Sequence, residues 1–549
     1  MSEIDDPKFF FSPNGKRNFY LELIATIATL KKDKSDDENS TLCHYPSRSN
    51  WLLNHIPNLK DEIFKPSCQK LHAELKKLNA KSATLVFTSA HMNAPASAFG
   101  HTFLRLDANP NTPLLSYAIN YAAQTTEENA FVYAYQGFFG GYNGRYTIEP
   151  YYKKLQTYSE LEHRDIWEYK LKLSQKELER MVLHIFELRH FYSDYFFLAE
   201  NCSYNLLWLL EVAKPSINLT QQFNYKAIPL DTIRAIMDEN LVQNTTYRPS
   251  KHKTILALSN PILQTPTALA FAKSDDYNLS AISRLSKEKK IAALELATAL
   301  LKIKQQEGTI SKKAYLPLFL KLLKHRSKLG KGKKQIVEEP IAPNKGHKST
   351  RVTLGYEKNK KIHLETKFSY HDIYDNDNGF IPGAYINFLE TDLEYDNNHL
   401  ILKKFNLIDI HSYAIQDQLF TPISWQISTG AKRIFKNKLY AYVESGAGIT
   451  LGNETLFGYA TVTPTVYYKS DLDYSLSANL GLLYAPSSSL KFGLLGKDEW
   501  FSQQREIQTV EPFFTYSLDT ENAFNLKYNH RTINHEAQES FTASWFWYY

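Results

Sequence analysis

The spacing of apolar positions changes along the chain, and each change predicts a different kind of element. Up to about residue 80, apolar residues recur every three or four positions, which is typical of amphipathic helices. From about residue 82 the spacing falls to two, the period of half-buried strands. Helices are predicted at 18–30, 47–56, 68–78, 174–189 and 202–212, and strands at 83–88, 101–107, 113–122 and 164–173. We therefore expect a helical cap followed by an α+β domain.

Beyond this domain the pattern changes twice more. Residues 216–260 lack a clear period and are expected to be irregular. Residues 262–326 read as helices with lysines on their exposed faces, and a lysine-rich cluster closes this region at 321–334. That cluster is compatible with binding to anionic lipid headgroups. It is equally compatible with a solvated linker, because glycines and prolines follow it.

After about residue 350 the alternation is that of strands to the end of the chain. Tyr474, Leu476, Leu480 and Leu482 alternate with small polar residues, and the chain ends on an alternating aromatic run. About 200 residues at roughly 16 per strand and turn give about 12 strands, within the range of outer-membrane barrels. A soluble barrel or sandwich would show the same alternation with its apolar face inward. The aromatic end favours membrane insertion, where a closed barrel leaves no unpaired edge in lipid.

These periods predict four segments. They are a helical cap at 1–80, a thiol-enzyme domain at 81–260, a basic helical linker at 261–349 and an antiparallel β-barrel at 350–549. A chain of 549 residues with 43% hydrophobic content agrees with several folded domains. A net charge of +6 at this length does not call for nucleic acid.

The sequence shows neither a transmembrane helix nor a signal peptide. No apolar run of about 18 residues exists, and the first six residues are acidic and polar. The protein is then either cytoplasmic or has a leader upstream of the given start. The three cysteines favour the leader, since Cys43 and Cys68 lie close in a polar segment where a disulfide fits an oxidising compartment. Three ordinary buried thiols are the alternative.

Cys202 is the third cysteine, and its position at the start of a predicted helix is suited to a nucleophile. Asn201 can cap the apolar helix that follows, so Cys202 falls in the first helical turn, where the helix dipole and free backbone amides favour a thiolate. The same amides could form an oxyanion hole. The alternative is that Cys202 is an ordinary buried cysteine that packs in the core and has no catalytic role. His101, at the start of a strand, is the predicted general base.

Asn120 is the predicted third catalytic group. If the hairpin after the His101 strand closes with residue 108 opposite residue 113, His101 faces Asn120 across the sheet. An amide there could hold one imidazole nitrogen and fix its tautomer. A slip of one residue would remove this contact.

We assign substrate binding to Arg105, Gly140, Gly141 and Tyr204. The two glycines lie in a glycine-rich loop, residues 138–145, where backbone could approach a ligand, although tight turns explain them as well. Neither a metal nor another cofactor is predicted, because His184 and His190 are six residues apart and do not share a helix face.

Several motifs resemble a known family. They are SEIDDPKFFFSPNGK at the start, CHYPSR at Cys43, SAFGHTFLRL at His101, FFGGYNGR at 138–145, HRDIWEYKL at 163–171 and AENCSYNLLWLLE at Cys202. In this order they look like the Lnb-type periplasmic domain family, over roughly residues 1–260. The order of histidine and cysteine also resembles circularly permuted papain-like folds, which include lecithin:retinol acyltransferase-like proteins and NlpC-type amidases.

The resemblance implies a periplasmic Cys–His acyltransferase whose namesake moves an acyl chain from phospholipid to the amino terminus of a lipoprotein. His101 and Cys202 match the motif positions, whereas Asn120 rests on the register alone. The first hypothesis is therefore a thiol acyltransferase at the outer membrane of a Gram-negative bacterium, with phospholipid and a lipoprotein or other amine as substrates. The second is a thiol hydrolase acting on cell-wall peptide or lipid. The third is a non-enzymatic barrel with a periplasmic module.

Overall fold

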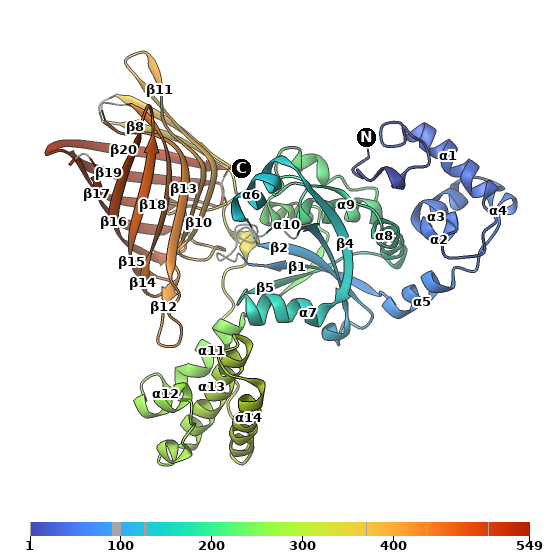
Figure 1. Ribbon diagram of the computed structural model, residues 1–549, viewed down its shortest axis with the longest axis horizontal. Helices are drawn as coiled ribbons and strands as arrows, with labels where there is room; N and C mark the ends of the chain where they lie inside the picture. The colour runs from blue at the N-terminus through green and yellow to red at the C-terminus, as the bar shows by residue number, and fades with distance from the viewer. Residues whose placement is uncertain are drawn as a thin grey trace. The chain divides into compact units, whose positions relative to one another are not determined.

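A computed structural model describes residues 2–89, 100–125, 127, 129–358, 360–368, 370–435, 438–502 and 504–549. Residues 91–99, between the strands expected at 83–88 and 101–107 and interpreted as a loop, lie outside these residues. The chain divides into two compact units. The first contains Met1–Ser89, His101–Gln222 and Glu239–Glu339, and the second contains Phe223–Asp238 and Pro340–Tyr549. Each unit has its own sheet (Figure 1).

The N-terminal cap of the first unit is helical, as the spacing predicts. Asn18 caps its first helix by accepting hydrogen bonds from the amides of Tyr20 and Leu21. The helices are α1 (Phe19–Lys32), α2 (Thr41–His44), α3 (Pro46–His55), α4 (Leu59–Glu62) and α5 (Gln69–Leu78). The predicted disulfide is present and joins Cys43 of α2 to Cys68, the residue before α5. It ties together a cap that has only a small apolar core of its own.

A seven-stranded antiparallel sheet forms the centre of the first unit, in the order β6-β4-β3-β2-β1-β5-β7. The strands are β1 (Ser82–Thr88), β2 (His101–Asp107), β3 (Tyr117–Gln124), β4 (Tyr142–Pro150), β5 (Ile166–Leu171), β6 (Ser193–Tyr195) and β7 (Val242–Arg248). The helices that contact the sheet include α7 (Tyr151–Leu155), α8 (Gln175–Leu188) and α9 (Cys202–Ala213). A capping box between Ser174 and Glu177 opens α8, at the start of the helix predicted at 174–189.

Three local predictions in this region were wrong. Residues 216–260 are not irregular, since they contain α10 (Pro229–Asp238), β7 and α11 (Lys251–Ser259). The strand expected at 113–122 starts only at Tyr117, because Pro113–Leu115 form a 3-10 turn. The expected glycine-rich loop is the junction between α6 (Ala130–Phe139) and β4. Short strands and turns have no clear period of apolar residues, so this periodicity does not predict them.

The rest of the first unit is helical. After α11 come α12 (Pro266–Lys273), α13 (Lys287–Gln306) and α14 (Lys312–Ser327). Among the described residues, no helix is long and apolar enough to cross a membrane.

Twelve antiparallel strands close into a barrel in the second unit, as the length estimate predicts. They are β8 (Arg351–Glu357), β9 (Lys361–Lys367), β10 (Ala384–Asp396), β11 (His399–Ser412), β13 (Ser424–Arg433), β14 (Leu439–Gly452), β15 (Leu456–Tyr468), β16 (Leu472–Ser487), β17 (Leu490–Phe501), β18 (Glu506–Ser517), β19 (Asn522–Ile533) and β20 (Glu536–Tyr548). Pairing of β20 with β8 joins the last strand of the barrel to its first, and pairing of β14 with β15 completes the ring. A two-residue strand, β12 (Ile415–Gln416), pairs in parallel with β14.

The barrel turns its apolar side chains outward. In β16, Leu476, Leu480 and Leu482 are 47%, 61% and 50% exposed, whereas the intervening Ser475 and Ser477 are buried. In β20, the aromatic run at the end of the chain, Trp545 and Trp547 also point outward. This is the polarity of a barrel in lipid, so the soluble alternative, with an apolar face inward, is wrong.

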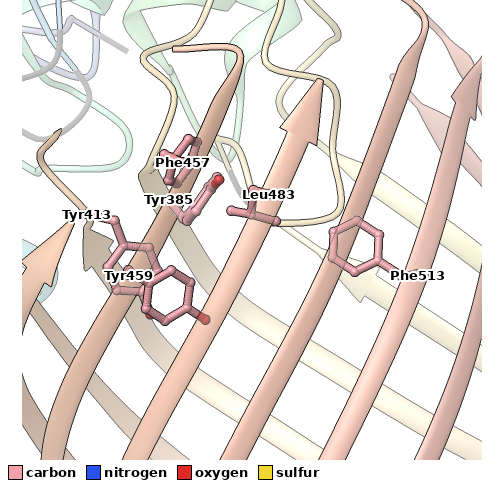
Figure 2. Packing of buried hydrophobic residues seen from close by; sticks show 6 residues of the cluster. All are labelled: Tyr385, Tyr413, Phe457, Tyr459, Leu483 and Phe513. Carbon is pink, nitrogen blue, oxygen red and sulfur yellow. The ribbon is translucent and has the colours of Figure 1, made fainter. Parts of the chain in front are cut away.

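The connection between β9 and β10 folds into the barrel. Tyr374 donates its hydroxyl hydrogen bond to Glu511 of β18, and Lys491 of β17 binds the carbonyl of Asp375. Beside this segment, an apolar cluster fills part of the interior, with the rings of Tyr413 and Tyr459 stacked 3.8 Å apart (Figure 2). The barrel interior is therefore partly occupied by the chain itself.

Candidate active site

β2 and α9 bring the two predicted catalytic residues together. His101 is the first residue of β2, and Cys202 is the first residue of α9, which packs on β2 and β3. The two side chains are hydrogen-bonded to each other across 100 residues of sequence. Cys202 is buried, while His101 keeps a partly exposed ring at the strand end. This arrangement places a thiol and an imidazole in direct contact.

Asn120 fixes the orientation of the imidazole. His101 Nε2 lies 2.6 Å from Asn120 Oδ1. A carboxamide oxygen only accepts, so Nε2 carries the proton and donates it. The other ring nitrogen, Nδ1, is then left with the lone pair that a general base needs to take the Cys202 proton.

Hydrogen-bond donors around the sulfur favour the thiolate. Burial alone would raise the pKa of Cys202, but the positive charge and hydrogen bond of His101, followed by the backbone N–H and the hydroxyl of Thr102, lower the pKa from 9.0 to about 7. The Thr102 hydroxyl lies 3.8 Å from Sγ. On His101, burial lowers the pKa, whereas the Cys202 thiolate and Asn120 raise it, and the net direction is upward. The contact therefore stabilises a thiolate–imidazolium pair.

The backbone amides at the start of α9 were predicted to form an oxyanion hole, but they donate hydrogen bonds within the protein. Asn201 caps the helix as expected, and its side-chain oxygen accepts from the amides of Ser203 and Tyr204. These two amides are therefore not free for an oxyanion. The Cys202 amide instead donates to the hydroxyl oxygen of Tyr195. Burial, reinforced by the Cys202 charge, raises the pKa of Tyr195 well above its usual range, so the phenol keeps its proton.

Sequence reasoning missed four residues around the pair. Thr102 and Tyr195 contact Cys202, while the ring of Tyr158 lies 5.8 Å from the His101 ring and covers it. Arg164 is buried next to Tyr158, with an ion pair to Glu162 and a hydrogen bond to Thr88. Thr102 and Arg164 lie within the motifs at His101 and at 163–171, but no pattern in the sequence marks Tyr158 and Tyr195.

Arg105 does not line the site as predicted. Its side chain is 8% exposed, forms ion pairs with Asp107 and Glu168 at 2.7 and 2.8 Å, and lies over the ring of Tyr151. An arginine engaged on every side inside the sheet is a structural residue, because its charge is already neutralised by buried carboxylates. We therefore correct its assignment from substrate binding to the core of the sheet.

The other predicted binding residues also have local roles. Gly140 and Gly141 adopt positive φ values of 90° and 142° between α6 and β4, a conformation that disfavours side chains. A Cβ at Gly140 would lie 2.9 Å from the Phe196 ring. The hydroxyl of Tyr204 donates to Glu3 of the N-terminal segment at 3.3 Å. Ligand contact by these three residues stays a prediction.

A large cavity of the first unit lies away from Cys202. It has a volume of about 1140 Å³ and is lined by α1, α3, α8 and the C-terminal half of α9, with Phe19, Trp51 and Trp208 among its walls. Size alone is a poor guide to the reacting centre, so the paired thiol and imidazole define the candidate active site.

Comparisons with known proteins agree with this division of the chain. Residues 70–239 match the family model of the Lnb N-terminal periplasmic domain. Residues 340–548 and 1–55 match two domain families of unknown function, DUF7840 and DUF7843. A search of curated proteins gives no match.

Solved structures of outer-membrane proteins match part of the chain. An outer membrane channel from Pseudomonas putida F1 has 9% identity, covers 37% of this chain and 96% of its own, and gives a TM-score of 0.25. The KdgM porin in complex with disordered oligogalacturonate has 10% identity, covers 36% and 98%, and gives 0.23. A loop L8 deletion mutant of OmpT, an outer membrane protein of Vibrio cholerae, has 6% identity, covers 36% and 97%, and gives 0.21.

Proposed function

We propose that the protein is a thiol acyltransferase in the periplasm and outer membrane of a Gram-negative bacterium. Two findings support this proposal: residues 70–239 match the family model of the Lnb N-terminal periplasmic domain, and the barrel of the same chain turns its apolar face outward. Cys202 takes an acyl group from a phospholipid as a thioester and passes it to an amine, such as the amino terminus of a lipoprotein. The observation that carries the proposal is the contact of Cys202 with His101, which in turn is held by Asn120.

The first half-reaction makes the acyl-enzyme. His101 Nδ1 holds the proton of Cys202, and the thiolate attacks the ester carbonyl carbon of the lipid. In the tetrahedral intermediate the carbonyl oxygen bears the negative charge. The Tyr195 hydroxyl keeps its proton and accepts from the Cys202 amide beside the sulfur, so it is the donor best placed to stabilise that oxygen. The carbon–oxygen bond then breaks, and His101 gives its proton to the departing lysolipid hydroxyl.

The second half-reaction releases the acyl chain. An amine attacks the thioester carbonyl while His101 Nδ1 accepts the amine's proton, the carbon–sulfur bond breaks, and an amide forms. Water in place of the amine would give a free fatty acid by the same steps, so exclusion of water decides between transfer and hydrolysis. The barrel supports a membrane lipid as donor, because it holds the same chain in the bilayer that contains that lipid.

The proposal is tested by intact-protein mass spectrometry. Purified full-length protein is incubated with phosphatidylethanolamine and phosphatidylglycerol vesicles, and we expect a mass increase of one acyl chain that hydroxylamine removes. Cys202→Ala and His101→Ala should abolish this increment. His190→Gln, a histidine change elsewhere in the same domain, should leave it unchanged.

Addition of a synthetic lipopeptide amine then identifies the acceptor. Transfer predicts an N-acylated peptide, whereas a hydrolase predicts free fatty acid and unmodified peptide. If folded wild-type protein with a titratable thiol gains no acyl mass, phospholipid is not the donor. A cell-wall peptide substrate or a non-enzymatic module would then replace this proposal.

A further inference from the structure

Two histidines and an aspartate converge within the second unit. His347 precedes β8, while His371 and Asp375 lie in the segment that folds into the barrel between β9 and β10. Their exposures are 7%, 0% and 1%, so water does not serve as their main partner. One ligand atom from each lies within 4.8 Å of the other two. Sequence analysis predicted no metal, and the spacing of these residues in the chain gives no hint of the group.

In each imidazole, the outer nitrogen, which is the one pointing away from the other histidine, donates a hydrogen bond. His347 Nδ1 lies 2.8 Å from the backbone carbonyl of Lys348, which only accepts. His371 Nε2 lies 2.9 Å from Oδ1 of Asp377. Because Lys491 also binds this Asp377 oxygen, the carboxylate is ionised and accepts. Each ring therefore carries its proton on the outer nitrogen.

The inner nitrogens then face each other with two lone pairs. His347 Nε2 and His371 Nδ1 are 3.0 Å apart, and with neutral rings neither has a hydrogen to donate. Two buried acceptors at this distance repel each other unless a cation lies between them. Asp375 Oδ2 lies 3.9 Å from His347 Nε2, faces the same point and also accepts from the Asp372 amide. The other Asp375 oxygen binds Arg351 and the Tyr548 hydroxyl, which hold the carboxylate in place.

We propose that His347, His371 and Asp375 bind a divalent transition-metal ion, with Zn²⁺ as the best-fitting probe. Imidazole nitrogen and carboxylate oxygen are ligands that Zn²⁺ accepts, and two tetrahedral Zn–N bonds separate their nitrogens by roughly 3.3 Å, close to the distance found. The outer hydrogen bonds to a carbonyl and a carboxylate are those that orient metal-binding histidines. The ion would fasten the segment inside the barrel to the chain that enters β8.

Two other histidines of the barrel show why this pair stands apart. His411 places one nitrogen 2.9 Å from Asp409 and the other 2.8 Å from the hydroxyl oxygen of Tyr413, which donates its own hydrogen to Gln426, so a protonated ring satisfies both contacts. His363 lies between the carboxylates of Glu357 and Asp392, which a protonated ring satisfies as an ion pair. These two residues therefore provide matched controls.

Metal content of the full-length protein in detergent tests the proposal. The protein is stripped with a chelator, titrated with ZnCl₂, desalted and analysed by inductively coupled plasma mass spectrometry. We expect about one zinc per chain in wild type, and loss of this zinc in His347→Gln and His371→Gln. His411→Gln and His363→Gln should retain it. Asp377→Asn, which removes only an outer partner, should weaken zinc binding about 10- to 100-fold.

Cobalt substitution gives a readout that does not depend on the variants folding. Co²⁺ in wild type should develop the visible absorption of a four-coordinate nitrogen–oxygen site, and Zn²⁺ should displace it. Absence of this band together with substoichiometric zinc would overturn the proposal and assign a shared proton to the histidine pair. Loss of zinc in His363→Gln instead of His347→Gln would overturn it by moving the site to Glu357, His363 and Glu394.

Discussion

His101 Nε2 lies 2.6 Å from Asn120 Oδ1, although Asn120 is not directly opposite His101 in the sheet. Leu104 pairs with Ile119, where the predicted hairpin placed Tyr117. The register is thus shifted by two residues from the prediction, because a 3-10 turn at Pro113–Leu115 lengthens the connection. A shift of two preserves the face of the strand, and diagonal neighbours remain within reach of an imidazole and an amide.

Asn120→Ala should slow acyl-enzyme formation by about 100-fold, the lower end of general-base contributions, because the imidazole loses the partner that fixes its tautomer. The rate is measured by quenched mass spectrometry with phospholipid vesicles. Asn120→Asp keeps an acceptor oxygen and should recover part of the rate, with an altered pH profile. Equal rates in wild type and Asn120→Ala would show that His101 is oriented by other contacts.

Alkylation of Cys202 should report its lowered pKa. With a pKa of about 7 against 9.0 for an ordinary thiol, the thiolate forms as pH rises through neutrality and is lost as pH falls below it. The iodoacetamide rate should follow this curve. In His101→Gln the imidazolium charge is gone and burial still opposes ionisation, so the pKa should rise and the rate at pH 7 should fall roughly 10- to 50-fold.

Cys202→Ser provides the blank for this experiment, since the disulfide consumes the other two cysteines. Burial of the sulfur slows alkylation equally in wild type and His101→Gln, so the shift along the pH axis is the informative quantity. An unshifted profile in His101→Gln would mean that the imidazole carries no charge near the sulfur.

The parts of the site that sequence could predict are those fixed by local rules. A capping residue before an apolar helix places Cys202 at a helix start, and strand periodicity places His101 at a strand end. Tyr195 and Tyr158 could not be predicted in this way. Their positions depend on how β6 and the segment after β4 pack around α9, and such long-range packing leaves no periodic trace in the chain.

Tyr195→Phe should separate the oxyanion role from the thiol chemistry. Removal of one oxyanion donor typically lowers kcat by about 10²- to 10³-fold, with little effect on KM. The Cys202 alkylation profile should hardly change, because His101 and Thr102 still surround the sulfur. A normal acylation rate in Tyr195→Phe would exclude this hydroxyl as an oxyanion donor.

Arg105→Ala should destabilise the first unit without a specific effect on substrate. The change leaves Asp107 and Glu168 buried without their main cation, a loss of about 3–5 kcal/mol in unfolding free energy. Arg248→Ala is the control, since Arg248 is 36% exposed and binds the other Glu168 oxygen. It should cost about 1 kcal/mol or less. Unchanged urea unfolding with a raised KM in Arg105→Ala would restore the substrate-binding assignment.

A lysine on the outer face of the barrel should cost more than one on the inner face. Leu480, in the middle of β16, is 61% exposed, and Leu480→Lys would place a charge in the lipid at a cost of about 2–4 kcal/mol. Asn479 is the adjacent residue and faces inward, opposite Lys497 of β17, so a lysine there stays out of the lipid, with Glu499 as a diagonal neighbour. Folding into lipid vesicles, followed by the mobility shift of unheated barrel on SDS gels, should therefore fail or weaken for Leu480→Lys alone. Equal yields for the two variants would contradict a lipid-facing β16.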